Sequence, residues 1–143
     1  MKKLLLFAAL LLWQSATWAC SCYIGAVSEK YKNHLSIFHG KVVEIVFYDK
    51  QDFFGDTHIK VTFDITQQWK GRPEQNVLLT VYNGSSCYGY WFREGQNYIV
   101  YAFEDGETLN AWWCGGVISE SDSPKEFKSE IRDLNSLTQR KGI

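Results

Sequence analysis

Four cysteines constrain this chain more than any other feature, because all of them follow an apolar leader. They are Cys20, Cys22, Cys87 and Cys114. An even number of cysteines in an exported chain predicts two disulfides. Cysteines separated by one residue seldom bridge each other, so Cys20 and Cys22 are each expected to join one of the other two. In the chain-entropy account, loops of that length give a bridge roughly 4 kcal/mol of stabilisation.

Residues 1–19 have the pattern of a signal peptide. A basic start at Lys2 and Lys3 precedes an apolar run over residues 4–13, and Thr17 and Ala19 place small residues before the expected cleavage. Cleavage there makes Cys20 the first residue of a secreted or periplasmic chain. The apolar run is too short to span a bilayer, so we expect no transmembrane segment. A lipid-anchored form is the alternative, since a cysteine after a bacterial leader can be acylated.

Residues 20–143 fit a single domain. Loss of Lys2 and Lys3 with the leader takes the formal net charge from −1 to −3, and a mildly acidic chain is a poor ligand for nucleic acid. The sequence contains no nucleophile elbow, phosphate-binding loop or catalytic-triad signature, so we expect a chain that is not an enzyme and has no cofactor of its own. A monomer is expected. The histidines and cysteines lack the spacing of zinc sites, and His34, His39 and His58 are expected to be surface or hydrogen-bonded structural residues.

Alternating apolar residues predict five strands. Ile59, Val61 and Phe63 are separated by polar residues, which indicates a strand with one buried face. The expected strands cover residues 37–48, 58–69, 77–82, 98–103 and 108–114. Gly40 is expected to be a bend or bulge in the first strand, and Asp105-Gly106 a hairpin turn between the last two. A short helix is expected near residues 28–33.

The last part of the chain predicts a longer helix. Ser123 and Glu126 have the spacing of a capping box, with proline between them at the first helical position. Phe127, Ile131 and Leu134 then fall on one face, which should pack on the sheet. Five strands and a terminal helix indicate a mainly β fold, an OB-fold-like five-stranded barrel with two disulfides. Four tryptophans are expected in its core or at its rim: Trp69, Trp91, Trp112 and Trp113.

In order along the chain, a set of short motifs resembles the netrin-like domain, and within it the inhibitory domain of tissue inhibitors of metalloproteinases. A single-domain bacterial member is the best fit, and the motifs span nearly the whole mature chain. They are Cys20-Ser21-Cys22, Phe38-His39-Gly40-Lys41-Val42, Phe63 through Trp69-Lys70-Gly71, Ser85-Ser86-Cys87, Phe92 through Gly95, Tyr98-Ile99-Val100-Tyr101-Ala102 and Cys114-Gly115-Gly116.

The resemblance implies a function and a pairing of the cysteines. It implies that the α-amine and carbonyl oxygen of Cys20 chelate the zinc of a partner metalloprotease, and that the bridges are Cys20–Cys87 and Cys22–Cys114. The zinc would therefore belong to the protease. The inhibitory contacts would come from six residues: Cys20, Ser21, Cys22, Tyr23, Ser85 and Ser86.

The chain departs from the vertebrate inhibitors in lacking their third bridge and their second, cysteine-rich domain. The alternative function is a non-inhibitory extracellular or lipid-anchored netrin-like module, in which the same cysteines only lock the barrel. Bridges that only staple a segment are the commoner arrangement. The position of Cys20 favours the inhibitor, because a chelating α-amine has to belong to the first residue. Its reference pKa of about 7.7–8.0 leaves a neutral fraction at neutral pH.

Overall fold

The computed structural model describes residues 25–51, 55–72, 74, 76–82, 89–105 and 108–141. Both expected helices and all five expected strands are present, with limits within three residues of those predicted. The elements are α2 (Val27–Asn33), β1 (Ser36–Gln51), β2 (Thr57–Lys70), β3 (Val77–Tyr82), β4 (Asn97–Asp105), β5 (Thr108–Ala111), α3 (Trp113–Gly116), β6 (Val117–Ser119) and α4 (Pro124–Lys141).

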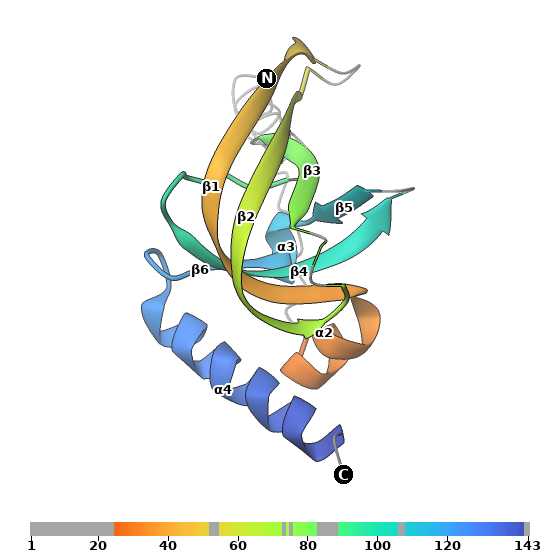
Figure 1. Ribbon diagram of the computed structural model, residues 1–143, viewed down its shortest axis with the longest axis vertical. Coiled ribbons are helices and arrows are strands. Elements are labelled where there is room, and N and C mark those ends of the chain that lie inside the picture. Colours follow the sequence, from red (N-terminus) through yellow and green to blue (C-terminus); the bar gives the residue numbers. More distant parts are fainter. Residues whose placement is uncertain are drawn as a thin grey trace, which may run out of the picture.

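The strands close into a five-stranded barrel with the C-terminal helix α4 outside it (Figure 1). Neighbouring strands follow the order β1-β2-β3-β5-β4, and β4 returns to pair with β1. All these pairs are antiparallel except β3 and β5, which run parallel with Leu78 opposite Leu109. The prediction of a mainly β fold with a terminal helix is therefore confirmed.

The inside of the barrel is filled by the alternating residues of its strands. Ile59, Val61 and Phe63 of β2 are almost completely buried, as their spacing predicted. The ring of Phe63 meets the rings of Phe38 and Phe92 edge to face, with ring centres 5.2 and 5.5 Å apart. This packing of aromatic edges against faces fixes the middle of the barrel.

A second apolar cluster lies between the barrel and the helices. Alternate residues of β4 point in opposite directions, so Val100 faces the inside of the barrel while Ile99 and Tyr101 face outward. The outward pair packs against Phe127 and Leu134 of α4, which are buried as expected. Because β4 is covered on both faces, it has a continuous apolar sequence instead of an alternating one.

Two details of the strands differ from expectation or refine it. The fifth strand ends at Ala111 instead of Cys114, because Gly115 has a φ of 78° and turns the chain through α3. A sixth strand, β6, follows and pairs with the N-terminal half of β4. Its three residues are too few to show a period in the sequence. The strand register shifts between His39 and Gly40, which confirms the predicted irregularity.

The described tryptophans divide between the core and the surface. Trp69 is 7% exposed and lies in the second cluster, as expected of a core residue. Trp91 and Trp112 are each 44% exposed, so these two lie outside the core. Trp112 instead lies at the surface with its ring edge to face against Phe103. An indole is large enough to bury one side against a neighbour while its other side faces water.

Candidate functional site

The residues predicted to contact a protease lie outside the described part of the chain. These are Cys20, Ser21, Cys22, Tyr23, Ser85 and Ser86, and Cys87 lies outside it as well. Two described regions adjoin them in the sequence, the helix α2 and the end of β3 together with Gly89. A third, the turn α3, contains the remaining cysteine, Cys114. The geometry of these regions decides how the candidate site can be held.

Cys114 is disulfide-bonded and partly buried in the turn α3. Its partner does not lie in the described ranges, so its pairing with Cys22 stays a prediction. A shallow hollow beside it is lined by Asn33, His34, Phe103 and Trp112. The C-terminal end of α2 is therefore next to the half-cystine that follows β5.

The parallel pairing of β3 and β5 brings two chain segments to one end of the barrel. The Oγ1 of Thr80 lies 3.4 Å from the carbonyl oxygen of Ala111, to which it donates a hydrogen bond. Parallel neighbours finish at the same edge of a sheet. The segment after β3 leads to Cys87 and the segment after β5 leads to Cys114, so both segments leave the barrel on the same side.

Gly89 fixes the chain where it returns from residues 83–88. Its φ is 77°, and a Cβ atom at this position would lie 1.8 Å from the carbonyl oxygen of Val81. The adjacent Tyr90 amide donates to that same oxygen at 3.2 Å. Only glycine allows so close a backbone approach. β3 ends at Tyr82, and the chain at Gly89 and Tyr90 lies against the backbone of Val81.

The helix α2 is attached to the rest of the fold by a buried ion pair. The Lys30 ammonium pairs with the Glu130 carboxylate of α4, and the two residues are 7% and 6% exposed. The Oη of Tyr101 in β4 donates to the same carboxylate oxygen at 2.5 Å, and the Lys30 nitrogen lies 4.7 Å from the centre of its ring. Burial and the neighbouring Glu130 raise the pKa of Tyr101, so this phenol stays protonated and keeps donating.

A second set of hydrogen bonds joins α2 to the end of β2. The Lys70 ammonium donates to the carbonyl oxygen of Tyr31 at 2.8 Å, and the Oη of Tyr31 donates to the carbonyl oxygen of Trp69 at 3.1 Å. At the end of the helix, Nδ1 of His34 lies 2.8 Å from the carbonyl oxygen of Lys30, which can only accept. Burial lowers the pKa of His34, so the ring is neutral and carries its proton on Nδ1.

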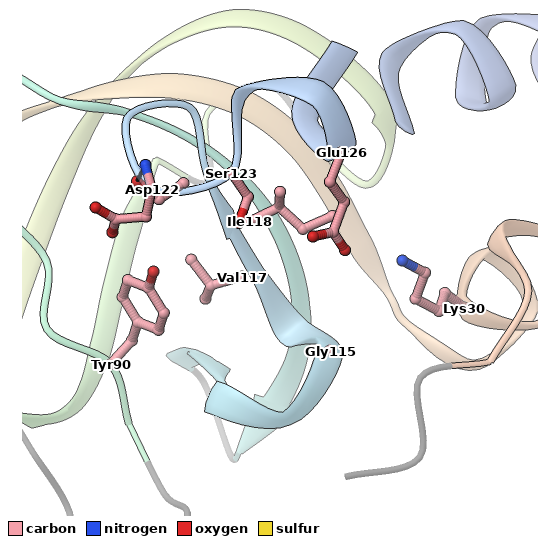
Figure 2. A pocket seen from close by; sticks show the side chains of 9 residues that line it. Lys30, Tyr90, Gly115, Val117, Ile118, Asp122, Ser123 and Glu126 are labelled. Carbon is pink, nitrogen blue, oxygen red and sulfur yellow. Dashed lines mark hydrogen bonds between the residues drawn. The ribbon is translucent and has the colours of Figure 1, made fainter. Parts of the chain in front are cut away.

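A pocket of about 200 Å³ separates α2 from the turn and strand that follow Cys114. Figure 2 shows Lys30 on one side of it and Tyr90 and Asp122 on the other. Burial, followed by the charge of Asp122, raises the pKa of Tyr90 to about 12, so this phenol is also protonated at neutral pH. Val117 and Ile118 line the pocket between these polar groups.

Within the described ranges, no three His, Cys, Asp or Glu side chains come together as a metal site. The described helices include none that is long and apolar enough to cross a membrane. His39 differs from expectation, because its Nε2 is buried and finds no hydrogen-bond partner. The His39 ring packs edge to face against the ring of Phe127, with ring centres 5.2 Å apart. The sequence matches no protein-family model and no curated protein.

The residue types alone do not predict the buried pair of Lys30 and Glu130, because lysine and glutamate are ordinarily surface residues. The sequence does carry one signal for it. Glu130 lies three residues after Phe127 and four before Leu134, which places it on the buried face of α4. A charged residue at such a position requires a partner of opposite charge from another element.

Proposed function

We propose that this chain is a secreted, monomeric inhibitor of zinc metalloendopeptidases of the netrin-like type, in which Cys20 chelates the zinc of the target. A closed five-stranded barrel with a C-terminal helix fits the fold that this family implies. The neighbouring order β1-β2-β3-β5-β4, closed by β1 and β4, supports an OB-type barrel.

The observation that carries the proposal is the parallel pairing of β3 and β5. It directs the chain toward Cys87 and toward Cys114 from the same end of the barrel. Bridges Cys20–Cys87 and Cys22–Cys114 would then tie a three-residue segment at two neighbouring points. A chain end is ordinarily mobile, and two such ties would remove most of that freedom before the target binds.

The chemistry follows from the first residue of the mature chain. The α-amine and carbonyl oxygen of Cys20 can close a five-membered ring on one metal ion. A catalytic zinc keeps one coordination position for water, and a chelate that takes this position removes the nucleophile of the protease. Ser21, Cys22 and Tyr23 would follow along the cleft on one side, with Ser85 and Ser86 on the other.

The intact mass of the exported protein tests the first requirement. We expect a chain that starts at unmodified Cys20 and lacks four hydrogens because of two disulfides. An added acyl mass, or residues ahead of Cys20, would rule out the chelate and favour the lipid-anchored or non-inhibitory module. Peptide mapping without reduction then assigns the two bridges.

Inhibition assays test the chelate itself. The mature protein should inhibit members of a panel of zinc endopeptidases that carry the His-Glu-x-x-His helix. One alanine added before Cys20, or acetylation of its amine, should abolish inhibition while the circular dichroism spectrum and thermal midpoint stay unchanged. Inhibition that survives either change would show that Cys20 is not the zinc ligand.

A further inference from the structure

The helix α2 is too short to be stable without tertiary contacts. It has seven residues, and its N-cap residue Ala26 makes no side-chain capping hydrogen bond. Isolated helices shorter than about 12–15 residues are marginal in water. The order of α2 therefore depends on the side chains that attach it to the barrel and to α4.

The Lys30–Glu130 pair joins α2 to two other elements at once. Glu130 belongs to α4, and Tyr101, which shares the same carboxylate oxygen, belongs to β4. Because both charged groups are more than nine-tenths buried, removal of one leaves the other without compensation in an apolar site. The contacts of Tyr31 with Lys70 and Trp69 are only partly buried, so water can replace them more easily.

Because α2 is close to Cys22 in the sequence, the Lys30–Glu130 pair also bears on the candidate site. Four residues, Tyr23 to Ala26, separate Cys22 from the first residue of α2. A connection of this length spans at most about 18 Å from Cys22 to Val27, so the position of α2 limits where Cys22 can lie. Lys30 also lines the pocket that faces Gly115, the residue after Cys114 (Figure 2).

We propose that Lys30 and Glu130 are positioning residues of the inhibitor: they hold α2 in place and thereby fix the leading segment that reaches the protease. This inference rests on the proposed function. Neither side chain touches the target. Their effect on inhibition passes through α2, and it should follow the order of α2 more closely than the stability of the barrel.

The test compares three variants of the mature, oxidised protein. Glu130→Gln removes the charge but keeps an oxygen that can accept from Tyr101. The double variant Lys30→Met with Glu130→Leu removes both charges and keeps apolar volume, a replacement that proteins often tolerate. Lys128→Gln is the control, because it also removes one charge from α4 and Lys128 is exposed. Amide hydrogen exchange and the inhibition constant are measured for each.

In Glu130→Gln, we expect the α2 amides to exchange at least about tenfold faster, while the β4 amides keep most of their protection. The inhibition constant should rise by about tenfold, under conditions where the barrel remains folded. The double variant should restore both values to within about threefold of the original, and Lys128→Gln should change neither.

Three results would overturn the positioning role. The first is unchanged exchange of α2 in Glu130→Gln, and the second is faster exchange of α2 with an unchanged inhibition constant. Equal acceleration of all amides would assign the pair to global stability and would equally reject the proposal. A protein without substitutions that inhibits no zinc endopeptidase rejects the proposed function itself, and the exchange data still decide whether the pair orders α2.

Discussion

Replacement of Gly89 by alanine should destabilise the domain more than the same replacement at Gly95. Both glycines have a φ of 77°. The left-handed conformation costs an alanine about 1–2 kcal/mol, and this cost applies at both positions. A Cβ atom at Gly95 would meet nothing within 4 Å, whereas one at Gly89 would lie 1.8 Å from the oxygen and 2.6 Å from the carbon of the Val81 carbonyl.

The steric part of the effect is therefore confined to Gly89. The two backbones would have to separate by roughly 1 Å to reach the shortest distances at which real Cβ atoms are found, and forced shifts of this kind cost about 1–3 kcal/mol. We expect about 1–2 kcal/mol for Gly95→Ala and about 2–5 kcal/mol for Gly89→Ala. The free energy of unfolding of a domain is about 5–15 kcal/mol, so Gly89→Ala should still fold.

Urea denaturation of the mature, oxidised proteins measures both changes. Gly89→Ala should also weaken inhibition, because the chain that carries Ser85 and Ser86 returns to the barrel at this residue. Gly95→Ala should leave inhibition unchanged. Equal losses of stability in the two variants would refute the reasoning, since they would show that Gly89 does not pack against the Val81 backbone as described.

Three further substitutions test other parts of the fold. Burial lowers the pKa of His39, so the unfolded chain binds more protons and stability should fall as the pH drops from 7 to 5. His39→Gln should reduce this slope in urea titrations at each pH, and an identical slope would contradict the assignment. Asn135→Leu removes the acceptor of the Trp69 indole, 2.7 Å away, and should cost about 1–3 kcal/mol in urea denaturation; no loss would mean that the bond contributes nothing. Leu134→Ala empties a fully buried position and should cost about 2–5 kcal/mol, whereas Leu137→Ala, only partly buried, should cost clearly less by thermal denaturation; similar losses would argue against the described packing of α4.

The sequence was sufficient for the elements whose pattern is local. Ile59, Val61 and Phe63 alternate with polar residues and are buried as this period requires. The helix α4 begins at Pro124, directly after the predicted capping residue Ser123, and Phe127 lies on its buried face. In these segments, the preference of each residue and the tertiary fold favour the same structure.

The remaining features depend on contacts between distant parts of the chain. Lys30 and Glu130 are 100 residues apart, and their burial follows from the meeting of two helices. Trp112 is exposed because β5 ends at Ala111 and the turn α3 begins directly after Trp112, and this early end depends on how β6 returns to pair with β4. The expected site residues lie outside the described ranges, so Cys20 and its neighbours remain predictions from the sequence.

The strand β4 forms a wall that the two apolar cores share, with Val100 on one side and Ile99 and Tyr101 on the other. A substitution that moves the backbone of β4 therefore changes the packing of the barrel interior and also the packing between the barrel and the helices. Changes of volume at β4 therefore need compensation on both sides. By contrast, β2 has exposed residues such as Asp64 on its outer face, and its inner residues can be redesigned with only the barrel interior to consider.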